Sequence, residues 1–248
     1  MSPAQVKIAE SEFLSHKPLF EDQAEEIMLF LASLTSYELA QNLGISNQLA
    51  VKAHNLAYDF PHKIMGYEAI QGFIGEAYRG LDISTLAPQI IKEASDKVRI
   101  ISSIYGILAP TDIIKPYRCE YNKHVNLDHK TPIQIYKPKI TTSFVNFIKE
   151  KKIEDVINLL PADADKCLDW KIIRAFTKVH KIVFQTITPE GKLKTPIAKR
   201  LKELRGIMCR TILEHNIKSF EELTKVKSEH FIFSPADSKP LLPVFISD

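Results

Sequence analysis

The densest run of side chains that could take part in chemistry lies between Arg99 and Tyr121, with the sequence RIISSIYGILAPTDIIKPYRCEY. A β-branched apolar run over 98–103 predicts a buried strand, and polar and aromatic side chains follow it. Such side chains often form a ligand pocket. The candidate pocket residues are Ser102, Ser103, Tyr105, Asp112 and Tyr117.

Serine and aspartate in this segment suggest a hydrolase, but the sequence has no GxSxG elbow, and spacing assigns no histidine as a base. We therefore assign no catalytic residue. An enzyme acting on a nucleotide or nucleic acid through the Ser102–Glu120 loop is the alternative function. Arg118 has two interpretations: it contacts a ligand, or it forms an internal ion pair with Glu120 or Asp112.

A second candidate segment is a basic helix predicted at about 196–215, with Thr195 as its cap and Pro196 in its first position. Apolar residues recur along one side of this helix, at Ile197, Leu201, Leu204, Met208 and Ile212. Its basic residues lie opposite or beside that stripe, at Lys199, Arg200, Lys202, Arg205 and Arg210. Lysine and arginine in this arrangement favour contacts with phosphate groups.

Gly206 interrupts the basic side of this helix, where glycine costs about 1 kcal/mol relative to alanine. Two explanations remain open for it. The missing side chain could let a phosphate approach the backbone, or it could let another helix pack closely.

Residues 36–59 predict two short helices joined by a tight turn at Gly44 and Ser46. This element resembles a helix-hairpin-helix, with Ser46 in the place of the second glycine. The turn would expose backbone N–H groups at a helix N-terminus, where phosphate binds without side-chain charge. Two core helices joined by a glycine turn would give a similar pattern.

The 33 basic and 30 acidic residues of this 248-residue chain are unevenly distributed. Residues 1–60 hold three basic and eight acidic residues, residues 98–139 hold seven and three, and residues 192–210 hold seven and one. The resulting net charges of −5, +4 and +6 have two interpretations: a polyanionic partner, or an ordinary solvated lysine-rich surface. If the two basic segments meet, they form a cleft that binds anions. Lys115 and Arg118 are the candidate contacts from the first of them.

Several other classes of function find no support in the sequence. The dispersed histidines and three separated cysteines (Cys119, Cys167 and Cys209) predict no metal site, and the cysteines are expected to be small buried groups. Gly75 and Gly80 have the spacing of a phosphate loop, but Leu81-Asp82 replaces its Lys-Ser/Thr, so we expect no cofactor. No apolar run is long enough for a bilayer, and no signal pattern opens the chain, so we expect a cytoplasmic protein that does not interact with membranes.

The alternation of helical and strand patterns, without repeats or a linker, predicts one mixed α/β domain over residues 1–248. We expect a central sheet surrounded by helices. The elements include helices over 21–34 and 67–74, and a hairpin that turns at Pro189-Glu190-Gly191.

Three blocks of the sequence resemble the YaaA peroxide-stress family: GEAYRGL, SSIYGILAPTDIIKPYRCEY and KRLKELRGIMCRTILEHNI. Ser2-Pro3-Ala4 also looks like the S-P-A-K block near the family's N-terminus. The resemblance implies a compact α/β fold with a helix-hairpin-helix and a positively charged cleft. It further implies that the protein binds double-stranded or branched DNA and limits free intracellular iron during peroxide stress. We expect a monomer.

The chain departs from the family pattern at several positions. From this sequence we expect no strand before the S-P-A-K block, where the family usually has one, and Gln5 replaces the lysine of that block. Residues 158–164 lack the Ser, Glu and Tyr of the N-L-A-S-x-E-Y block, and Glu203 replaces a lysine of the basic helix. These changes would impair a catalytic site more than a DNA-binding role that depends on charge.

Overall fold

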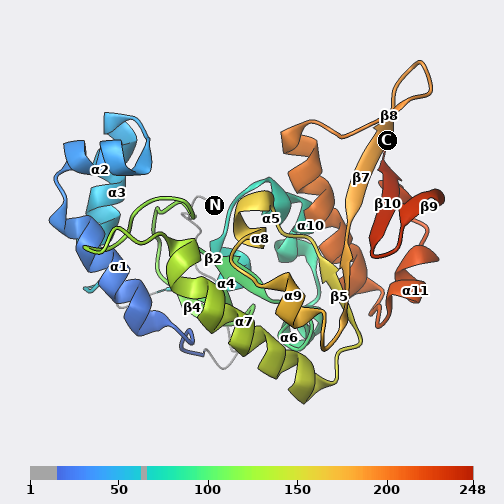
Figure 1. Cartoon of the computed structure of the whole chain (residues 1–248), viewed down its shortest axis with the longest axis horizontal. Helices are drawn as coiled ribbons and strands as arrows, with labels where there is room; N and C mark the ends of the chain where they lie inside the picture. Colours follow the sequence, from blue (N-terminus) through green and yellow to red (C-terminus); the bar gives the residue numbers. More distant parts are fainter. Residues whose placement is uncertain (1–15, 63–65, 248) are drawn as a thin grey trace. The chain divides into compact units, whose positions relative to one another are not determined.

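The computed structural model describes residues 16–62 and 66–247 (Figure 1). These residues fall into two compact units. The first comprises the described residues up to Gly75, together with 91–143 and 162–169; the second comprises 76–90, 144–161 and 170–247. Each unit is assembled from separate stretches of chain, so no linker in the sequence marks the division. The single domain stays a prediction, and Ser2-Pro3-Ala4 and Gln5 lie outside the described residues.

The first unit begins with three helices, as predicted. They are α1 (Glu21–Ser33), α2 (Ser36–Leu43) and α3 (Asn47–Asp59). A capping box starts α2, because the Thr35 side chain accepts from the Glu38 N–H while the Glu38 carboxylate accepts from the Thr35 N–H at 2.8 Å. The apolar side of α1, including Ile27 and Leu31, is fully buried.

Most of the remaining elements of the first unit are short, and its core is rich in aromatic residues, among them Phe60, Phe73, Tyr105 and Tyr117. The short elements are β1 (Tyr67–Glu68), α4 (Ala69–Gly72), β2 (Ile100–Ser102), β3 (Gly106–Leu108), β4 (Ile113–Ile114) and α8 (Ala162–Asp165). Strands β1 and β4 pair antiparallel, as do β2 and β3. The helix expected over 67–74 is therefore wrong at its start, where Tyr67 pairs with Ile114.

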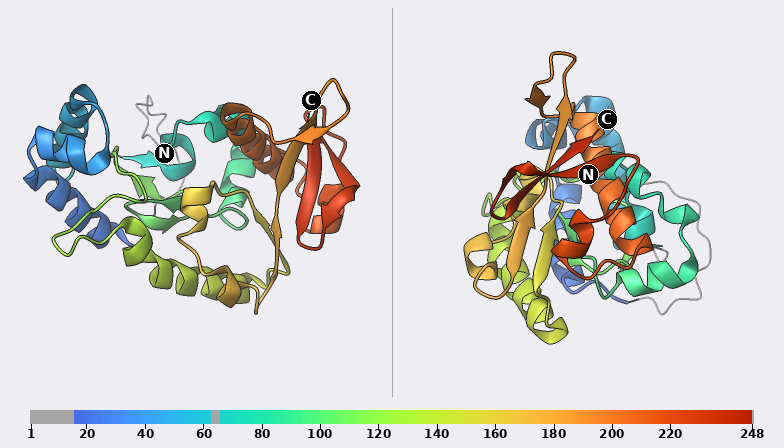
Figure 2. Two further views of the ribbon diagram at one scale, coloured as in Figure 1. Left: turned by 45° about the horizontal axis from the view of Figure 1, so that its top comes forward. Right: turned by 90° about the vertical axis from the view of Figure 1, so that its right-hand side faces the viewer.

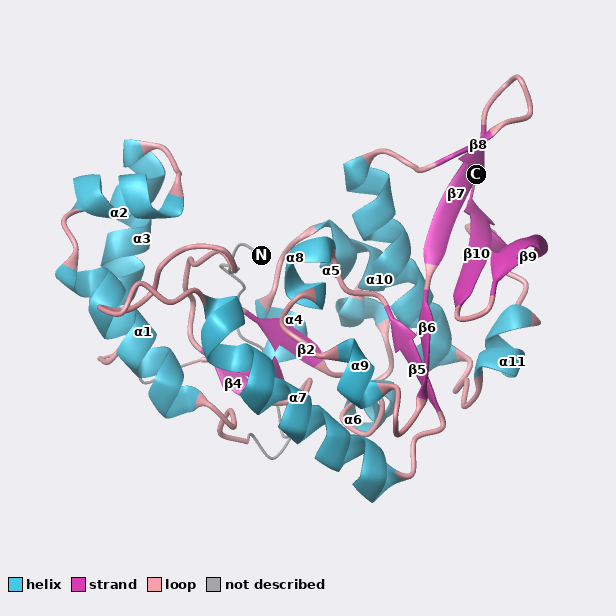
Figure 3. Ribbon diagram, viewed as in Figure 1, coloured by secondary structure: helices cyan, strands magenta, loops and turns pink. Residues whose placement is uncertain are grey.

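The second unit contains a four-stranded sheet in the order β8-β7-β10-β9 and a separate parallel pair, β5 with β6 (Figure 3). Its strands are β5 (Asp155–Asn158), β6 (Lys178–Lys181), β7 (Val183–Ile187), β8 (Leu193–Lys194), β9 (Phe231–Lys239) and β10 (Leu242–Ser247). Its helices are α5 (Glu76–Leu81), the 3₁₀ helix η1 (Ile83–Thr85), α9 (Trp170–Ile173), α10 (Ala198–Glu214) and α11 (Phe220–Thr224). Helices α6 (Pro88–Ala94) and α7 (Pro132–Lys151) carry residues of both units.

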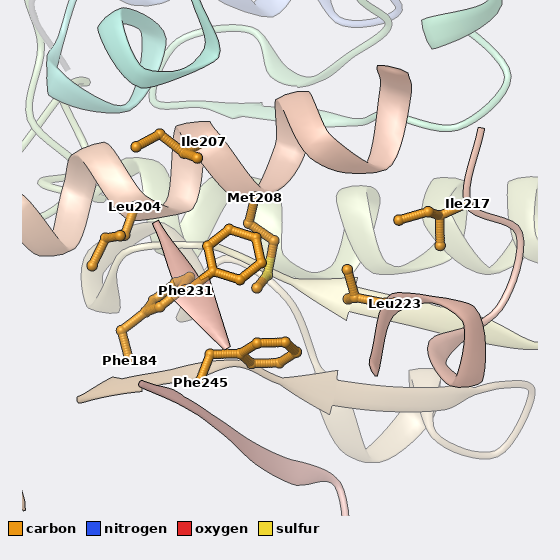
Figure 4. Packing of buried hydrophobic residues seen from close by; sticks show 8 residues of the cluster. All are labelled: Phe184, Leu204, Ile207, Met208, Ile217, Leu223, Phe231 and Phe245. Atoms are coloured by element: carbon orange, nitrogen blue, oxygen red, sulfur yellow. The ribbon is translucent and has the colours of Figure 1, made fainter. Parts of the chain in front are cut away.

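The core of the second unit forms where α10 packs on the four-stranded sheet (Figure 4). Leu204 and Met208 of α10 meet the rings of Phe184, Phe231 and Phe245. The rings of Phe231 and Phe245 lie edge to face with their centres 5.6 Å apart, an arrangement that aromatic pairs prefer. The mixed α/β class is confirmed, although the described strands are distributed over four small sheets rather than gathered in one central sheet.

Candidate nucleic-acid interface

The basic helix α10 begins two residues later than the sequence suggests. Its N-cap is Ile197, whose side chain cannot accept a hydrogen bond, so the cap expected at Thr195 and the first position expected for Pro196 are wrong. The N–H groups of the first turn therefore have no side-chain cap. Lys199 and Lys202 are exposed in the first two turns, and neither forms an ion pair within the described part of the chain. This end of α10 combines positive side chains with the positive end of the helix dipole.

The three arginines of α10 are engaged within the protein. Arg200 pairs with Glu203 at 3.1 Å, and Arg205 is half-buried and has partners of its own. Arg210, expected on the exposed side, is half-buried, and its Nη2 lies 2.7 Å from a Glu214 carboxylate oxygen. Its Nη1 donates to the carbonyl of Asp82 at 2.8 Å and to Thr85 Oγ1 at 2.7 Å. Arg210 thus fixes the turn after α5.

Gly206 is buried where α10 crosses α5. A Cβ at Gly206 would lie 2.7 Å from the Leu81 backbone nitrogen and closer still to the Ala77 carbonyl. Gly80 makes the reciprocal approach, because a Cβ there would lie 3.1 Å from the Glu203 carbonyl carbon. Of the two explanations for Gly206, helix packing is the one found. The expectation that a phosphate approaches Gly206 is corrected, because α5 occupies that place.

The turn between α2 and α3 has the geometry expected of its residues. Gly44 is exposed and left-handed (φ 65°), and Ser46 is the N-cap of α3, where its Oγ accepts from the Leu49 N–H at 3.4 Å. Lys123 was not among the predicted contacts. Its Nζ lies over the turn, 2.9 Å from where a Cβ of Gly44 would sit. A cation therefore lies beside the N-terminus of α3.

Lys115 and Arg118 are half-buried in the first unit. Lys115 Nζ donates to the Phe60 carbonyl at 3.0 Å, lies 5.1 Å from the centre of the Phe60 ring, and is 3.8 Å from a Glu25 carboxylate oxygen. Arg118 Nη2 pairs with Glu120 at 3.2 Å, as one of its two interpretations anticipates. Because Lys115 is directed into its own unit, its side chain is poorly placed for a phosphate.

The five candidate pocket residues are all buried, and each polar group has an internal partner. Ser102 Oγ lies 2.9 Å from the Tyr117 hydroxyl, and Ser103 Oγ donates to the Cys119 carbonyl at 2.7 Å. The Tyr105 hydroxyl accepts from the Lys115 N–H at 2.9 Å. These groups hold the 99–121 segment together, and they line neither of the two cavities described below.

Asp112 is the one carboxylic acid among the five candidate pocket residues. Its carboxylate accepts from the Ala109 N–H at 2.8 Å, and only 7% of the residue is exposed. Burial raises the pKa of Asp112 to about 6, because the charged form loses hydration. Burial likewise raises the pKa of Tyr117 to about 12. Both shifts oppose ionisation, as expected for groups enclosed in a core.

Two atoms of the Arg118–Glu120 pair lack hydrogen-bond partners among the described residues. Arg118 Nε and Glu120 Oε2 are both buried, one a donor and the other an acceptor. Buried polar atoms are nearly always paired. This donor and this acceptor therefore have hydrogen-bonding capacity that the described residues do not use.

A cavity of about 470 Å³ lies beside α10 in the second unit. Its charged lining residues carry both signs and comprise Arg79, Asp82, Glu203, Arg210, Glu214, Lys227 and Glu229. A smaller cavity of about 350 Å³ in the first unit is lined by residues of α1 and by 126–128. The sequence indicates neither cavity, because their walls come from segments that are distant along the chain.

The cysteines and the described helices add little to the site. Cys119 and Cys167 are buried, as predicted, and Cys209 is half-buried; all three are free thiols. Over residues 16–62 and 66–247, no cluster of three or more histidine, cysteine or acidic side chains is arranged to hold a metal ion. No helix in those ranges has the length and apolar character needed to cross a membrane.

The sequence of the chain matches a protein family and several relatives. A family model described as "Peroxide stress protein YaaA" matches residues 1–237. A UPF0246 protein of Shewanella pealeana is 30% identical over 238 residues, covering 93% of this chain and 90% of the relative. UPF0246 proteins of Polynucleobacter necessarius and Francisella tularensis subsp. novicida are 29% and 28% identical, covering 92% and 88% of this chain and 88% and 86% of those relatives.

Proposed function

We propose that this chain, which belongs to the peroxide stress protein YaaA family, binds the phosphate backbone of DNA. In this role it limits free intracellular iron and protects DNA during peroxide stress. The observation that carries the proposal is the start of α10, where exposed Lys199 and Lys202 flank N–H groups that no side chain caps. Such a helix end attracts anions through its dipole, and the lysines add full charges.

The α2–α3 turn supplies a second proposed contact. Exposed Gly44 and Ser46 leave backbone near the N-terminus of α3 open to an approaching phosphate, and Lys123 provides charge beside it. These features support contact with DNA from the acidic part of the sequence. The start of α10 belongs to the second unit and the α2–α3 turn to the first, so we propose two separate phosphate contacts, and the basic cleft expected from the sequence stays a prediction.

The chemistry of these surfaces suits phosphate rather than a base edge. Lysine ammonium groups and backbone N–H groups contact the phosphates of any sequence, so we propose double-stranded or branched DNA as the partner without sequence preference. The test is binding of fluorescent duplex DNA at several salt concentrations, with the Lys199→Ala/Lys202→Ala variant beside the wild type. Binding that is independent of salt and of both lysines would overturn the proposal.

A second candidate function is supported by the orphan atoms of the Arg118–Glu120 pair. A donor and an acceptor on two paired residues are the groups that the edge of a nucleobase would complement. The chain would then bind a nucleotide, or act on one, at this loop. The hydroxyls of Ser102 and Ser103 are already hydrogen-bonded internally, so the role proposed for the loop is binding.

Titration of nucleoside monophosphates by calorimetry tests the second candidate. Binding that the Glu120→Gln variant loses would support it, because the amide cannot accept at both positions. The absence of heat with all four common bases would contradict it.

A further inference from the structure

The hairpin formed by β7 and β8 extends beyond the strands that anchor it (Figure 2). Strand β7 pairs in parallel with β10 through Val183–Thr186, and only its end pairs with β8. In that short pairing Thr186 lies opposite Lys194, and Ile187 lies opposite Leu193. Ile187 and Leu193 consequently share one face of the hairpin, because residues opposite each other on paired strands point the same way.

The tip of the hairpin is a defined turn rather than a loose loop. The Gly191 N–H donates to the Thr188 carbonyl at 2.8 Å, and the Thr188 N–H donates to the Lys192 carbonyl at 2.8 Å. Pro189 fixes the second position of the turn, and Gly191 adopts the left-handed conformation (φ 77°) that closes it. The tip therefore presents its side chains at little conformational cost.

The exposed side chains of this region combine apolar and basic character. Ile187 is 57% exposed, Leu193 is 37% exposed, and Ile197 just beyond the hairpin is 75% exposed. Lys194 of β8 and Lys192, which directly precedes that strand, are also exposed. A group of exposed aliphatic side chains usually marks a contact surface, and the flanking lysines give that surface the charge that complements a polyanion.

We propose that this hairpin is a wedge that inserts Ile187 and Leu193 between stacked base pairs while Lys192 and Lys194 hold the adjacent phosphates. Aliphatic wedges combined with basic side chains are a recurring way to open the minor groove and kink a duplex. The inference rests on the proposed function and adds to it a deformation of the DNA that the lysines of α10 alone would not produce.

One residue of the tip opposes this role. Glu190 is exposed, and a hydrogen bond from the Thr188 side chain lowers the pKa of its carboxyl, so it is ionised at neutral pH. A carboxylate beside the DNA backbone repels it. Glu190→Gln should therefore bind duplex DNA more tightly than the wild type, whereas Glu229→Gln, which removes a charge from the cavity beside α10, should not.

The decisive experiment uses the full chain and duplexes carrying 2-aminopurine, whose fluorescence rises when the base unstacks. At saturating protein the wild type should raise this fluorescence, and Ile187→Ser/Leu193→Ser should lose the increase. Affinity of that variant for intact duplex should fall by less than about tenfold, since its phosphate contacts remain. The control Ile232→Ser/Leu242→Ser removes two exposed aliphatic side chains from β9 and β10 and should behave as the wild type.

The outcomes separate the two proposals. If the wild type binds duplex DNA without a rise in fluorescence, or if the serine variant retains the rise, the wedge is overturned and DNA binding stands. If the serine variant changes only self-association in sedimentation, the hairpin contacts a second copy of the chain and the wedge is again overturned. If the wild type does not bind DNA, both proposals fail.

Discussion

Gly206 of α10 lies directly against the carbonyl group of Ala77 in α5, and the space between them is too small for a Cβ atom. Gly80 completes the contact from the other helix, against the backbone at Glu203. The two helices therefore meet backbone to backbone. This contact positions the start of α10, and with it Lys199 and Lys202, relative to the rest of the second unit.

Gly206→Ala should destabilise the protein. The new methyl group overlaps the Ala77 carbonyl, and overpacking of this kind costs about 1–3 kcal/mol, which outweighs the better helix propensity of alanine. Urea unfolding followed by circular dichroism measures the loss. Gly75→Ala is the matched control, since a Cβ at Gly75 meets no atom within 4 Å; equal stability of the two variants would contradict the packing account.

Removing the Arg210 side chain should also destabilise the second unit. Arg210→Ala leaves the carbonyl of Asp82 and the Glu214 carboxylate without this donor, at a cost of about 1–3 kcal/mol. Thermal or urea unfolding measures the change. Arg79→Ala removes an exposed arginine paired only with Glu76 within the described chain and should cost less than about 1 kcal/mol. An Arg210 variant as stable as the wild type would show that this side chain does not hold the turn.

Asp112 should make folding stability fall as pH rises from about 4 to about 6. Burial raises the pKa of this carboxyl from 3.8 to about 6, so the folded protein binds a proton more tightly than the unfolded chain does in this interval. The stability contribution is present below pH 4 and is lost as pH passes through the folded pKa. Asp112→Asn should lack this component in urea unfolding at successive pH values, whereas exposed Asp128→Asn should retain it. A wild-type profile unchanged by Asp112→Asn would contradict the assignment.

Lys123 should matter for DNA binding but not for stability. Lys123→Gln removes the charge over the α2–α3 turn, and its affinity for duplex DNA should fall by several-fold at low salt, with a salt slope smaller by about 1. Ser46→Ala provides the contrasting case, because loss of the N-cap costs about 1 kcal/mol of stability. Unfolding curves and fluorescence anisotropy separate the two effects. If Lys123→Gln binds duplex DNA as tightly as the wild type, the α2–α3 turn is not part of the DNA interface.

The sequence predicts elements well where their pattern is local. The apolar spacing of α1 and the Pro189-Glu190-Gly191 turn between β7 and β8 lead directly to the observed elements. The expected helix over 67–74 fails at its start, because Tyr67 and Glu68 pair with β4, and local periodicity carries no information about such a partner. For the same reason the parallel pairing of β7 with β10 is not apparent from either segment alone.

The sequence predicts those features of the candidate site that depend on local periodicity and misses those that depend on contacts between distant segments. The exposure of Lys199 and Lys202 follows from helical periodicity, and the structure places both on the solvent side of α10. Gly206 admits two explanations until α5 is placed against it. Ser102 and Tyr117 look like pocket residues in the sequence, because a polar side chain with a buried partner cannot be distinguished there from one that awaits a ligand.

The most direct test of the central claim is the salt dependence of duplex binding by the wild type and by Lys199→Ala/Lys202→Ala, measured by fluorescence anisotropy. The account predicts a steep decline of affinity with salt for the wild type and a slope of log K against log salt smaller by about 2 for the variant. Lys218→Ala/Lys225→Ala, which removes the same charge near α11, should match the wild type. Equal slopes for the wild type and the Lys199→Ala/Lys202→Ala variant would contradict the claim that the start of α10 binds phosphate.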